Sequence, residues 1–357
     1  MPTLLLSLGA NLGHRAATLA TACDLLSLML GSRPVVSDFY ESEPMGFASD
    51  HRFLNCAARL ECSAQPADVL AVCCHVERLL GRTQKSHNGQ HTDRPVDIDL
   101  LAYGDTVMQT PDLTLPHPRM GKRSFVLLPL AEIAGDLRHP TTGLTYDEMA
   151  ARCTQGEATR IGGSAPQLCR RLTEADATPH TTEGLNRLLA QLSSRRLTWQ
   201  PDSLRALLRH DALRLLVLTD AKGDLIGTAS LLVTPQLTGL KSHLEDVVVD
   251  TAWRGKGLGA RLVANALAHA AREGIGSLEL TSRPEREAAN ALYRKMGFAP
   301  RPTNVYRTTG EALTRWASAA GALTSAATGK TSTTIEISGT TIEKTGTTLV
   351  KTGSPTG

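Results

Sequence analysis

The sequence predicts a two-domain α+β protein that ends in a low-complexity tail. Three observations support this prediction: the chain has 357 residues, strand-like and helix-like segments are mixed without a regular βαβ alternation, and the composition changes after about residue 310. A chain of this length exceeds one ordinary domain and is long enough for two domains with cores of their own. Strands that do not alternate with helices favour an antiparallel sheet with helices packed against it.

The first half contains segments with the periodicity of helices and of strands. Apolar residues at helical spacing predict helices over Arg15–Leu30, Pro66–Leu80 and Ser124–Ile133. The expected strands are Thr3–Leu8, Val35–Tyr40, Phe53–Leu60 and Asp97–Tyr103. Gly104 and Asp105 predict a hairpin-type turn into Thr106–Gln109. Prolines and glycines exclude regular structure between residues 41 and 51, and prolines exclude a helix over Leu115–Met120.

Two aspartates, Asp97 and Asp99, stand two residues apart in an otherwise apolar strand. Side chains at this spacing point to one face, so the two carboxylates are neighbours. Adjacent buried carboxylates repel each other, and their burial is costly unless a cation lies between them. Mg²⁺ suits this arrangement because it is held by one or two carboxylates plus substrate phosphates. The alternative is an edge strand whose acids face water.

Cationic side chains bracket the acid pair on both sides, as a polyphosphate site requires. They are Arg82, Lys85, Arg94, Arg119, Lys122 and Arg123. Together with the acid pair they form an ordered series of motifs: E-x-x-x-G-R at Glu77–Arg82, D-R-x-x-D-I-D-L-L at Asp93–Leu101, P-H-P-R-M at Pro116–Met120 and R-x-F-V-L from Arg123.

This series resembles the 6-hydroxymethyl-7,8-dihydropterin pyrophosphokinases of folate biosynthesis, over Pro2 to Ala151. The resemblance implies a ferredoxin-like antiparallel α/β sandwich. It also implies transfer of the terminal diphosphate of ATP to the pterin hydroxymethyl group, leaving AMP. Two Mg²⁺ ions on Asp97 and Asp99 would bridge the phosphates and offset their charge.

The resemblance further implies which residues bind the substrates. Pterin contacts would come from Ser42, Pro44, Met45, Phe53, Asn55 and Phe125, and ATP contacts from Glu77, Lys85, Arg94, Ile98, His117 and Arg123. Phe53 and Phe125 would stack on the heterocycle, while the amide of Asn55 can both donate and accept. For Glu77, an exposed helix position remains an equal alternative.

The polar segment Gly81–Thr92 is expected to be a mobile lid that closes over the substrates. Arg82 and Lys85 within the segment, and Arg94 just after it, would assist catalysis. The segment departs from the family pattern, because Asn88-Gly89-Gln90-His91 stands where an Arg-Trp pair and Gly-Pro are usual.

The second half carries a strand, a glycine-rich turn and a helix in succession. These are Leu244–Asp250, Arg254–Gly259 and Ala260–Arg272. Glycines in such a turn let backbone N–H groups approach a pyrophosphate at the start of a helix. A hairpin turn at Asp220–Asp224 precedes the strand Leu225–Val233. A Rossmann site would need these glycines after the first strand of a βαβ repeat, and that repeat is absent.

With the later segment Asn290–Phe298, this pattern resembles the GCN5-related N-acetyltransferases (GNAT), from about Leu168 to Thr308. The resemblance implies acetyl-CoA as cofactor, bound by Val247, Val249, Arg254, Gly255, Lys256, Gly257, Leu258, Gly259 and Asn290. Tyr293 would protonate the leaving thiolate. His243 and Glu245 share one face of a strand, and either could deprotonate an amine or be structural. The amine acceptor is left open.

The expected domain limits follow from composition. Residues 1–152 form the pterin pyrophosphokinase domain, 153–167 the linker, 168–310 the acetyltransferase domain and 311–357 the tail. Thr154–Pro166 is polar and contains glycine, so few contacts should cross it and a cut near Gly162 should give two soluble pieces. The tail is alanine-rich over Glu311–Ala327 and then repeats T-T-[IL]-x-x-x-G three times from Thr333, which predicts disorder or weak β-structure.

Charge and cysteine content narrow the partners. A net charge of +3 gives no reason to expect nucleic acid or an acidic membrane as partner. The seven cysteines include no C-x-x-C pair, which favours buried free thiols in a reducing cytosol. Neither a signal peptide nor a membrane-spanning run is evident, so we expect a soluble cytoplasmic enzyme of small molecules, its oligomeric state open. The alternative is that one domain is a non-catalytic binding or regulatory module.

Overall fold

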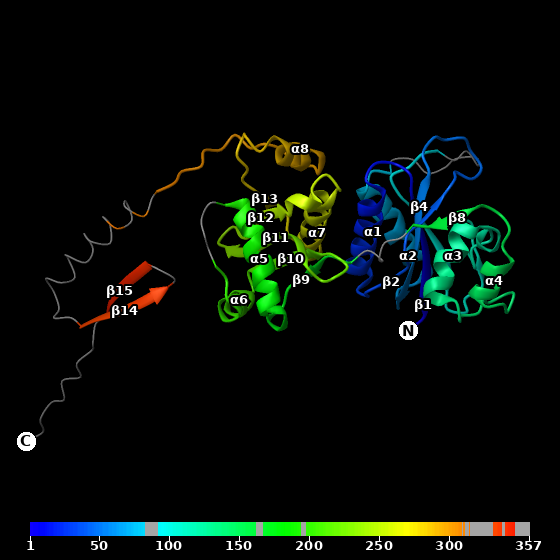
Figure 1. Cartoon of the computed structure of the whole chain (residues 1–357), viewed down its shortest axis with the longest axis horizontal. Helices are drawn as coiled ribbons and strands as arrows, with labels where there is room; N and C mark the ends of the chain where they lie inside the picture. The colour runs from blue at the N-terminus through cyan, green and yellow to red at the C-terminus, as the bar shows by residue number, and fades with distance from the viewer. Residues whose placement is uncertain are drawn as a thin grey trace, which may run out of the picture. The chain divides into compact units, whose positions relative to one another are not determined.

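The computed structural model describes residues 1–82, 92–161, 167–193, 198–308, 310, 314, 331–337 and 340–346. The chain divides into two compact units, Met1–Phe298 and Ala299–Gly357. The first unit contains two sheets, each with its own helices, and therefore both of the domains that the sequence predicts (Figure 1).

The first sheet is antiparallel throughout, in the order β5-β1-β4-β3-β8, with β2 also paired to β4. Its strands are β1 (Thr3–Ala10), β2 (Val35–Val36), β3 (Tyr40–Ser42), β4 (Phe53–Glu61), β5 (Asp97–Tyr103) and β8 (Ala158–Arg160). The helices of this domain are α1 (Arg15–Leu30), α2 (Pro66–Leu79), α3 (Ser124–Ala134) and α4 (Tyr146–Arg152), with a short 3₁₀ turn at Met120–Lys122. The α+β antiparallel prediction is confirmed.

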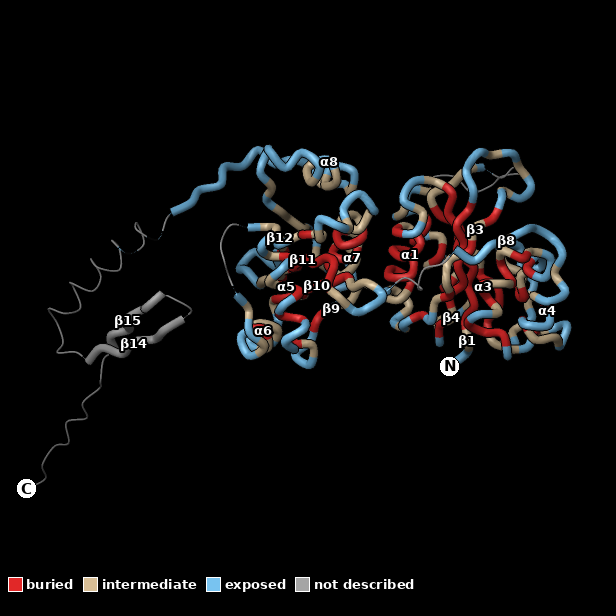
Figure 2. Tube along the Cα trace, in the orientation of Figure 1, coloured by how far each residue is buried: buried red, intermediate tan, exposed pale blue. Residues whose placement is uncertain are grey.

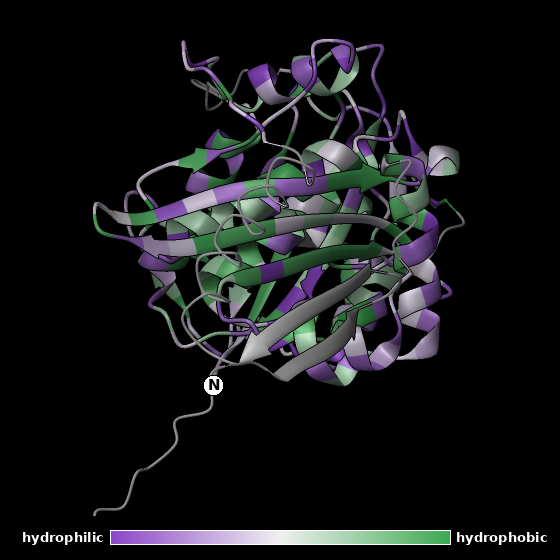
Figure 3. Cartoon of the chain, turned by 90° about the vertical axis from the view of Figure 1, so that its left-hand side faces the viewer, coloured by the Kyte–Doolittle hydropathy of each residue, from purple (hydrophilic) through white to green (hydrophobic). Residues whose placement is uncertain are grey.

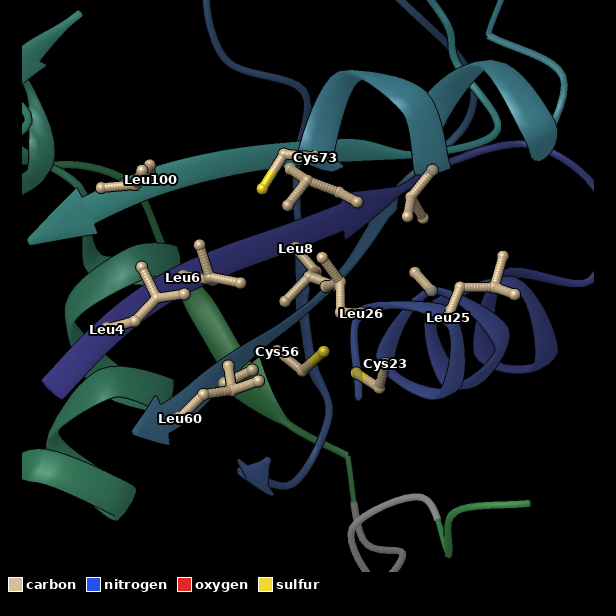
Figure 4. Packing of buried hydrophobic residues seen from close by; sticks show 14 of the residues in the cluster. Leu4, Leu6, Leu8, Cys23, Leu25, Leu26, Cys56, Leu60, Cys73 and Leu100 are labelled. Carbon is tan, nitrogen blue, oxygen red and sulfur yellow. The ribbon is translucent and has the colours of Figure 1, made fainter. Parts of the chain in front are cut away.

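Apolar side chains cover both faces of this sheet. Leu4, Leu6 and Leu8 of β1 point toward α1 and α2, as Figure 4 shows. Leu5 points the other way and packs with Leu101 against α3 and α4. Because successive side chains of a strand alternate between faces, one strand contributes to both cores.

Four local features differ from the sequence expectations. The exclusion of regular structure from residue 41 onward was wrong for residues 41 and 42, because β3 continues to Ser42 by pairing with β4. The predicted strand Val35–Tyr40 is interrupted, because the Ser37 hydroxyl accepts the Ala57 N–H (2.9 Å) in place of a backbone carbonyl. Strand β6 (Met108–Gln109) pairs with β7 (Thr114–Leu115) and not with β5. Helix α4 was not predicted, although Thr145 and Glu148 form a capping box at its start.

The second sheet is mixed, in the order β13-β12-β11-β10-β9. Only β12 and β13 run parallel. Its strands are β9 (Arg170–Arg171), β10 (Leu213–Thr219), β11 (Leu225–Gln236), β12 (Gly239–Val249) and β13 (Leu278–Glu279). Helices α5 (Pro179–Leu192) and α6 (Pro201–Leu208) pack on one face, and α7 (Leu258–Arg272) and α8 (Glu287–Lys295) on the other. Figure 3 shows green hydrophobic stretches along the strands.

The segment expected to be a linker is partly built into the first domain. Its residues Ala158–Arg160 form β8, which pairs with β3, and the Arg160 guanidinium contacts the Asp38 carboxylate. Leu168, just after the segment, is buried in the core of the first domain. The linker prediction was therefore wrong for residues 158–160, where β3 offers a free edge for pairing. Gly162 lies outside the described residues.

Helix α1 is buried on two sides, because it packs against the first sheet and also against α7 of the second domain (Figure 1). All residues from Leu19 to Leu26 are buried, which a helix with only one covered face would not show (Figure 2). The expectation that few contacts join the two domains was wrong.

A buried ion pair lies within this helix contact. The Asp24 carboxylate on α1 accepts hydrogen bonds from Arg261 Nε (2.6 Å), Arg261 Nη2 (3.0 Å) and Asn265 Nδ2 (3.0 Å) on α7. The backbone N–H of Cys169 donates a further bond to it (2.8 Å). The side chains of Asp24 and Arg261 are 0% and 6% exposed. All four donors to Asp24 therefore come from beyond the predicted linker.

The tail contributes one described hairpin, of β14 (Thr331–Ile337) and β15 (Thr340–Gly346). These strands overlap the first two sequence repeats, and the third repeat lies outside the described residues. The first compact unit ends at Phe298, earlier than the predicted limit at residue 310.

Two further expectations concern cysteines and membranes. All seven cysteines are free thiols, and Cys23, Cys56, Cys62 and Cys73 are buried as predicted. The prediction of burial was wrong for Cys74, Cys153 and Cys169, which are partly exposed. No helix in the described part of the chain combines the length and apolarity that crossing a membrane demands.

The Asp24–Arg261 pair generates a stability prediction. Arg261→Met should lower the free energy of unfolding by about 3–5 kcal/mol, because it leaves a buried carboxylate without its cation. The double variant Asp24→Leu/Arg261→Met should recover most of this loss, since an apolar pair of similar volume replaces the charges. Urea unfolding of the full chain measures both.

The matched control is Arg209→Met, which removes the exposed pair with Glu174 and should cost less than about 1 kcal/mol. An Arg261→Met loss as small as that of the control would contradict a buried, stability-determining contact between the two domains.

Candidate active sites

Strand pairing brings distant residues together at one end of the first sheet. Gly9 of β1 pairs with Asp97 of β5 on one side and with Asn55 of β4 on the other. Ser7, two residues earlier, pairs with Asp99. These side chains share the face that α3 and α4 cover, but they lie at an end left open as a cavity of about 250 Å³.

The cavity collects most of the residues that the sequence singled out. From the pterin group it contains Ser42, Met45, Phe53, Asn55 and Phe125, and from the phosphate and metal group Glu77, Arg82, Arg94, Asp97, Ile98, Asp99 and Arg123. Pro44 and His117 do not line it, and Lys85 and the rest of the expected lid from residue 83 to 91 lie outside the described residues. The roles assigned to all of these residues remain predictions.

Sequence reasoning did not single out the lining residues Glu43, Phe47, Leu70 and Cys74. Ser7 and Gly9 belong to the S-L-G-x-N-L-G segment, which the family resemblance places at the pterin end of the cleft, and Arg119 is one of the cations that bracket the acid pair; all three line the cavity. A Cβ at Gly9 would lie 3.0 Å from Asn55 Oδ1. A larger residue at position 9 would therefore crowd the Asn55 amide, and only the strand register reveals this.

Asp97 is held between two guanidinium groups. Its Oδ2 lies 2.7 Å from Arg94 Nη2, and its Oδ1 accepts a hydrogen bond from Arg82 Nη1. Burial opposes ionisation of Asp97, but the positive charges of Arg94 and Arg82 outweigh it and hold the pKa of this carboxyl below its usual value. Asp97 is therefore ionised at neutral pH.

Asp99 has much weaker compensation. Its closest cation is Arg123, with Nη1 4.0 Å from Oδ2. Burial, and next the negative charge of Asp97, raise the pKa of Asp99 to about 6. Asp99 is thus a buried carboxyl whose charge has little close compensation, and a divalent cation beside it would stabilise the ionised form. Among the described residues no group of three or more His, Cys, Asp or Glu side chains is arranged to hold a metal ion, so the acid pair would need oxygens of the substrates as further ligands.

Glu77 is neither exposed nor free to move. The residue is 4% exposed, and its Oε1 accepts hydrogen bonds from the Ile98 N–H (2.8 Å) and from Arg82 Nη1. It therefore joins the end of α2 to β5 and positions Arg82 beside Asp97. The exposed-helix alternative for Glu77 is excluded.

The pterin candidates combine aromatic rings with one amide. Asn55 Nδ2 donates to Ser42 Oγ (3.0 Å) and to the Tyr40 carbonyl (3.3 Å), which fixes the amide with Oδ1 toward Gly9. The Arg94 guanidinium lies 5.0 Å from the centre of the Phe53 ring, and Arg123 lies 5.6 Å from that of Phe125. Each ring thus lies next to an arginine that is predicted to bind the phosphates of ATP.

The turn after β1 fixes Arg94 through the side chain of Asn11. Asn11 Oδ1 accepts the Arg94 N–H (2.8 Å), and Asn11 Nδ2 donates to Asp93 Oδ1 (2.6 Å). The side chain of Asn11 therefore holds the D-R motif in place beside the cavity.

His117 lies beside two arginines outside the cavity lining. Burial, and next the charges of Arg123 and Arg119, lower the pKa of His117 to about 4, so the ring is neutral at pH 7. Its Nδ1 accepts the Arg119 N–H (3.3 Å), which assigns the ring proton to Nε2. A neutral ring with an Nε2–H can donate to a phosphate oxygen.

In the second domain the glycine-rich turn lies between β12 and α7, as predicted. Gly255 and Gly257 have φ values of 74° and 79°, a region that favours glycine, and α7 begins at Leu258. The Arg254 guanidinium is anchored by a bond from Nε to the Val249 carbonyl (3.2 Å). Lys256 Nζ lies 4.5 Å from the centre of the Trp253 ring.

The acid and base candidates lie on α8 and β12. Tyr293 on α8 is half-buried. Burial raises the pKa of its hydroxyl, and the negative charge of Glu245 adds to this rise, while the positive charge of Arg286 opposes it. Burial and next Asp246 raise the pKa of Glu245 on β12. His243 and Glu245 are both partly buried and share one face of β12, so both base candidates remain. The side-chain amide of Asn290 donates a hydrogen bond to the Arg283 carbonyl (2.9 Å), so this amide already has a partner within the domain.

Comparison with known proteins agrees with this geometry. Residues 5–135 match the family model of 7,8-dihydro-6-hydroxymethylpterin-pyrophosphokinase (HPPK). A 2-amino-4-hydroxy-6-hydroxymethyldihydropteridine pyrophosphokinase from Porphyromonas gingivalis is 45% identical over 141 residues, which are 39% of this chain and 95% of that protein. The chain belongs to the HPPK family. The enzyme of the same name from Bacillus subtilis is 34% identical over 148 residues, 41% of this chain and 87% of that one.

The HPPK domain is joined to a second domain with a family of its own. Residues 182–298 match the acetyltransferase (GNAT) family model, so the second domain is a GNAT domain. Among solved structures, a putative acetyltransferase from Agrobacterium tumefaciens is 27% identical, covers 40% of this chain and all of that one, and has a TM-score of 0.36. Both family assignments from the sequence are confirmed, and the chain is an enzyme of the HPPK family with a GNAT domain.

The raised pKa of Asp99 predicts how stability depends on pH in the HPPK domain. Folded Asp99 keeps its proton up to about pH 6, whereas an ordinary carboxyl loses it near pH 3.8. The folded state therefore binds more protons between these values, and the Asp99 contribution to the free energy of unfolding should fall as pH rises from about 4 through 6.

Asp99→Asn should remove this dependence and stabilise the chain at pH 7.5 in buffer containing EDTA. Urea unfolding at several pH values measures it, with Asp105→Asn in the exposed turn after β5 as the control. Equal destabilisation by Asp99→Asn at every pH would contradict the assigned pKa.

Proposed function

We propose that the HPPK domain transfers the terminal diphosphate of ATP to 6-hydroxymethyl-7,8-dihydropterin in folate biosynthesis. The pterin hydroxyl oxygen attacks the β-phosphorus, the bond from this phosphorus to the α–β bridging oxygen breaks, and AMP leaves. The observation that supports this most strongly is one cavity in which Asp97, Asp99 and several arginines lie beside Phe53 and Asn55. A flat heterocycle and a polyphosphate need these two kinds of surface side by side.

The pterin is bound, under this proposal, by the aromatic and amide side of the cavity. Both hydrogen bonds that the Asn55 side chain makes within the described residues use Nδ2, so Oδ1 can accept an N–H from the edge of the heterocycle. Phe53 and Phe125 supply apolar ring surface. The absence of a side chain at Gly9 leaves room beside the accepting oxygen.

The phosphates are bound by the cationic side. Arg94 and Arg123 lie next to the acid pair, and Arg119 lines the same cavity. Arg82 Nε and Arg94 Nε are buried and have no hydrogen-bond partner within the described residues, so both can donate to phosphate oxygens. His117 adds a neutral Nε2–H donor, and Lys85 of the expected lid would add charge.

Asp97 and Asp99 fit Mg²⁺, because they are adjacent carboxylates and the nearest cation to Asp99, Arg123, is 4.0 Å away. Bound there, Mg²⁺ would supply positive charge that polarises the phosphates during transfer. Asp99 is the more accessible ligand, with 35% of its side chain exposed, while Arg82 and Arg94 keep Asp97 ionised and in position.

Asp99→Asn tests this function directly. The variant should lower AMP formation from ATP and 6-hydroxymethyl-7,8-dihydropterin by at least about a hundredfold, because removing charge from the acid pair weakens stabilisation of the transferred phosphates. Asp105→Asn is the matched control, because Asp105 lies just beyond the D-R-x-x-D-I-D-L-L motif, and this variant should retain normal rates. Near-normal turnover by folded Asp99→Asn would disprove the assignment.

We infer further that the GNAT domain transfers the acetyl group of acetyl-CoA to an amine. The acetyl carbon forms a bond to the amine nitrogen, the thioester C–S bond breaks, and the thiolate takes a proton from the Tyr293 hydroxyl. Glu245 or His243 removes the amine proton. The half-buried position of Tyr293, close enough to Glu245 for their charges to interact, supports this assignment. Amino acids, polyamines, antibiotics and protein amines all remain open as acceptors.

Tyr293→Phe tests the acid role. With a panel of amines and acetyl-CoA, the variant should lower kcat about a hundredfold, the order expected for loss of a general acid, with little change in coenzyme A affinity. Tyr306→Phe, at an exposed tyrosine, is the control. Equal rates for Tyr293→Phe and wild type, with an accepted amine, would remove Tyr293 from the mechanism. No transfer to any amine would favour a binding module instead.

A further inference from the structure

The glycine-rich turn of the GNAT domain touches the HPPK domain. A Cβ at Gly257 would lie 3.0 Å from Ala17 Cβ and 3.1 Å from His14 Cβ. His14 immediately precedes α1, and Gly257 immediately precedes α7. The two helices thus start side by side, and the residue that would approach a coenzyme A pyrophosphate lies against a histidine of the other domain.

The buried Asp24 cluster fixes this contact. Asp24 lies farther along α1 from His14, and its partners Arg261 and Asn265 lie farther along α7 from Gly257. The same two helices are therefore joined at a second point by a desolvated ion pair. The distance from His14 to the turn is consequently set by the protein core and not by a surface contact alone.

Both sides of the contact are accessible to a ligand. Arg254, Gly255 and Lys256 are exposed, and so is His14. The imidazole of His14 has no hydrogen-bond partner in the described part of the chain, and neither Arg254 nor Lys256 is ion-paired there. A ligand with negative oxygens on this turn would meet donors from both domains.

We propose that the HPPK domain completes the coenzyme A site of the GNAT domain, with the His14 imidazole donating a hydrogen bond to the pyrophosphate on residues 254–259. This inference rests on the proposed acetyltransferase function, because it takes coenzyme A as the ligand of the turn. It adds that the site is shared between the domains. The GNAT domain then binds its cofactor fully only when attached to the HPPK domain.

Calorimetric titration of the full chain with coenzyme A tests the proposal. His14→Ala should weaken binding about tenfold, the order expected for one hydrogen bond to a charged group. His14→Gln, which keeps an N–H donor, should lose less. His75→Ala, at an exposed histidine of α2, is the matched control and should bind as wild type does. Unchanged melting temperatures establish that the variants are folded.

A titration with 3′-dephospho-coenzyme A identifies which phosphate of coenzyme A His14 contacts. The same tenfold loss with both ligands supports the pyrophosphate contact, whereas a loss confined to coenzyme A would overturn it in favour of the 3′-phosphate. Equal affinities of wild type and His14→Ala would overturn the shared site while leaving the acetyltransferase proposal intact. Failure of the wild type to bind coenzyme A would instead overturn the acetyltransferase proposal, and this inference with it.

Discussion

The ion pair between Asp24 and Arg261 is the interaction on which the arrangement of this protein depends. Asp24 is fully buried on a helix that packs against the first sheet with one side and against α7 with the other. A buried carboxylate is tolerated only with a full set of donors, and here all of them come from the second half of the chain. The HPPK and GNAT domains are therefore parts of one folded unit, and the glycine-rich turn of the GNAT domain is held next to the HPPK domain.

The cavity of the HPPK domain follows from a second constraint, the alternation of side chains along β-strands. Leu4, Leu6 and Leu8 fill the core under α1 and α2, so Ser7 and Gly9 must face the opposite side. There they meet Asp97 and Asp99 from β5, and the covering helices leave this end of the sheet open. The charge in the cavity is unevenly distributed: two arginines neutralise Asp97, while Asp99 has a distant cation and a raised pKa. This imbalance makes the pair suited to a divalent ion.

Local sequence patterns were sufficient for most elements and for the acid pair. Two aspartates at a spacing of two in an apolar strand had to be neighbours, and a G-x-G turn before an apolar-periodic segment had to start a helix. Features that depend on long-range pairing were not predictable in this way. Gly9 lies next to Asn55, and residues 158–160 pair with β3, only because of how the strands align in the folded sheet. Asp24 did leave a signal that went unused, since it is the only charged residue between Ala16 and Leu30. A single acid in such a helix indicates a buried partner.

The most direct test of this account is whether the two domains unfold together. Urea unfolding can be followed by tryptophan emission, because Trp199 and Trp253 lie in the GNAT domain, and by the reactivity of Cys56, Cys62 and Cys73, which are buried in the HPPK domain. If the Asp24–Arg261 contact makes one cooperative unit, the two probes should give the same midpoint. Two well-separated transitions, with the thiols still protected after the tryptophan emission has changed, would contradict it.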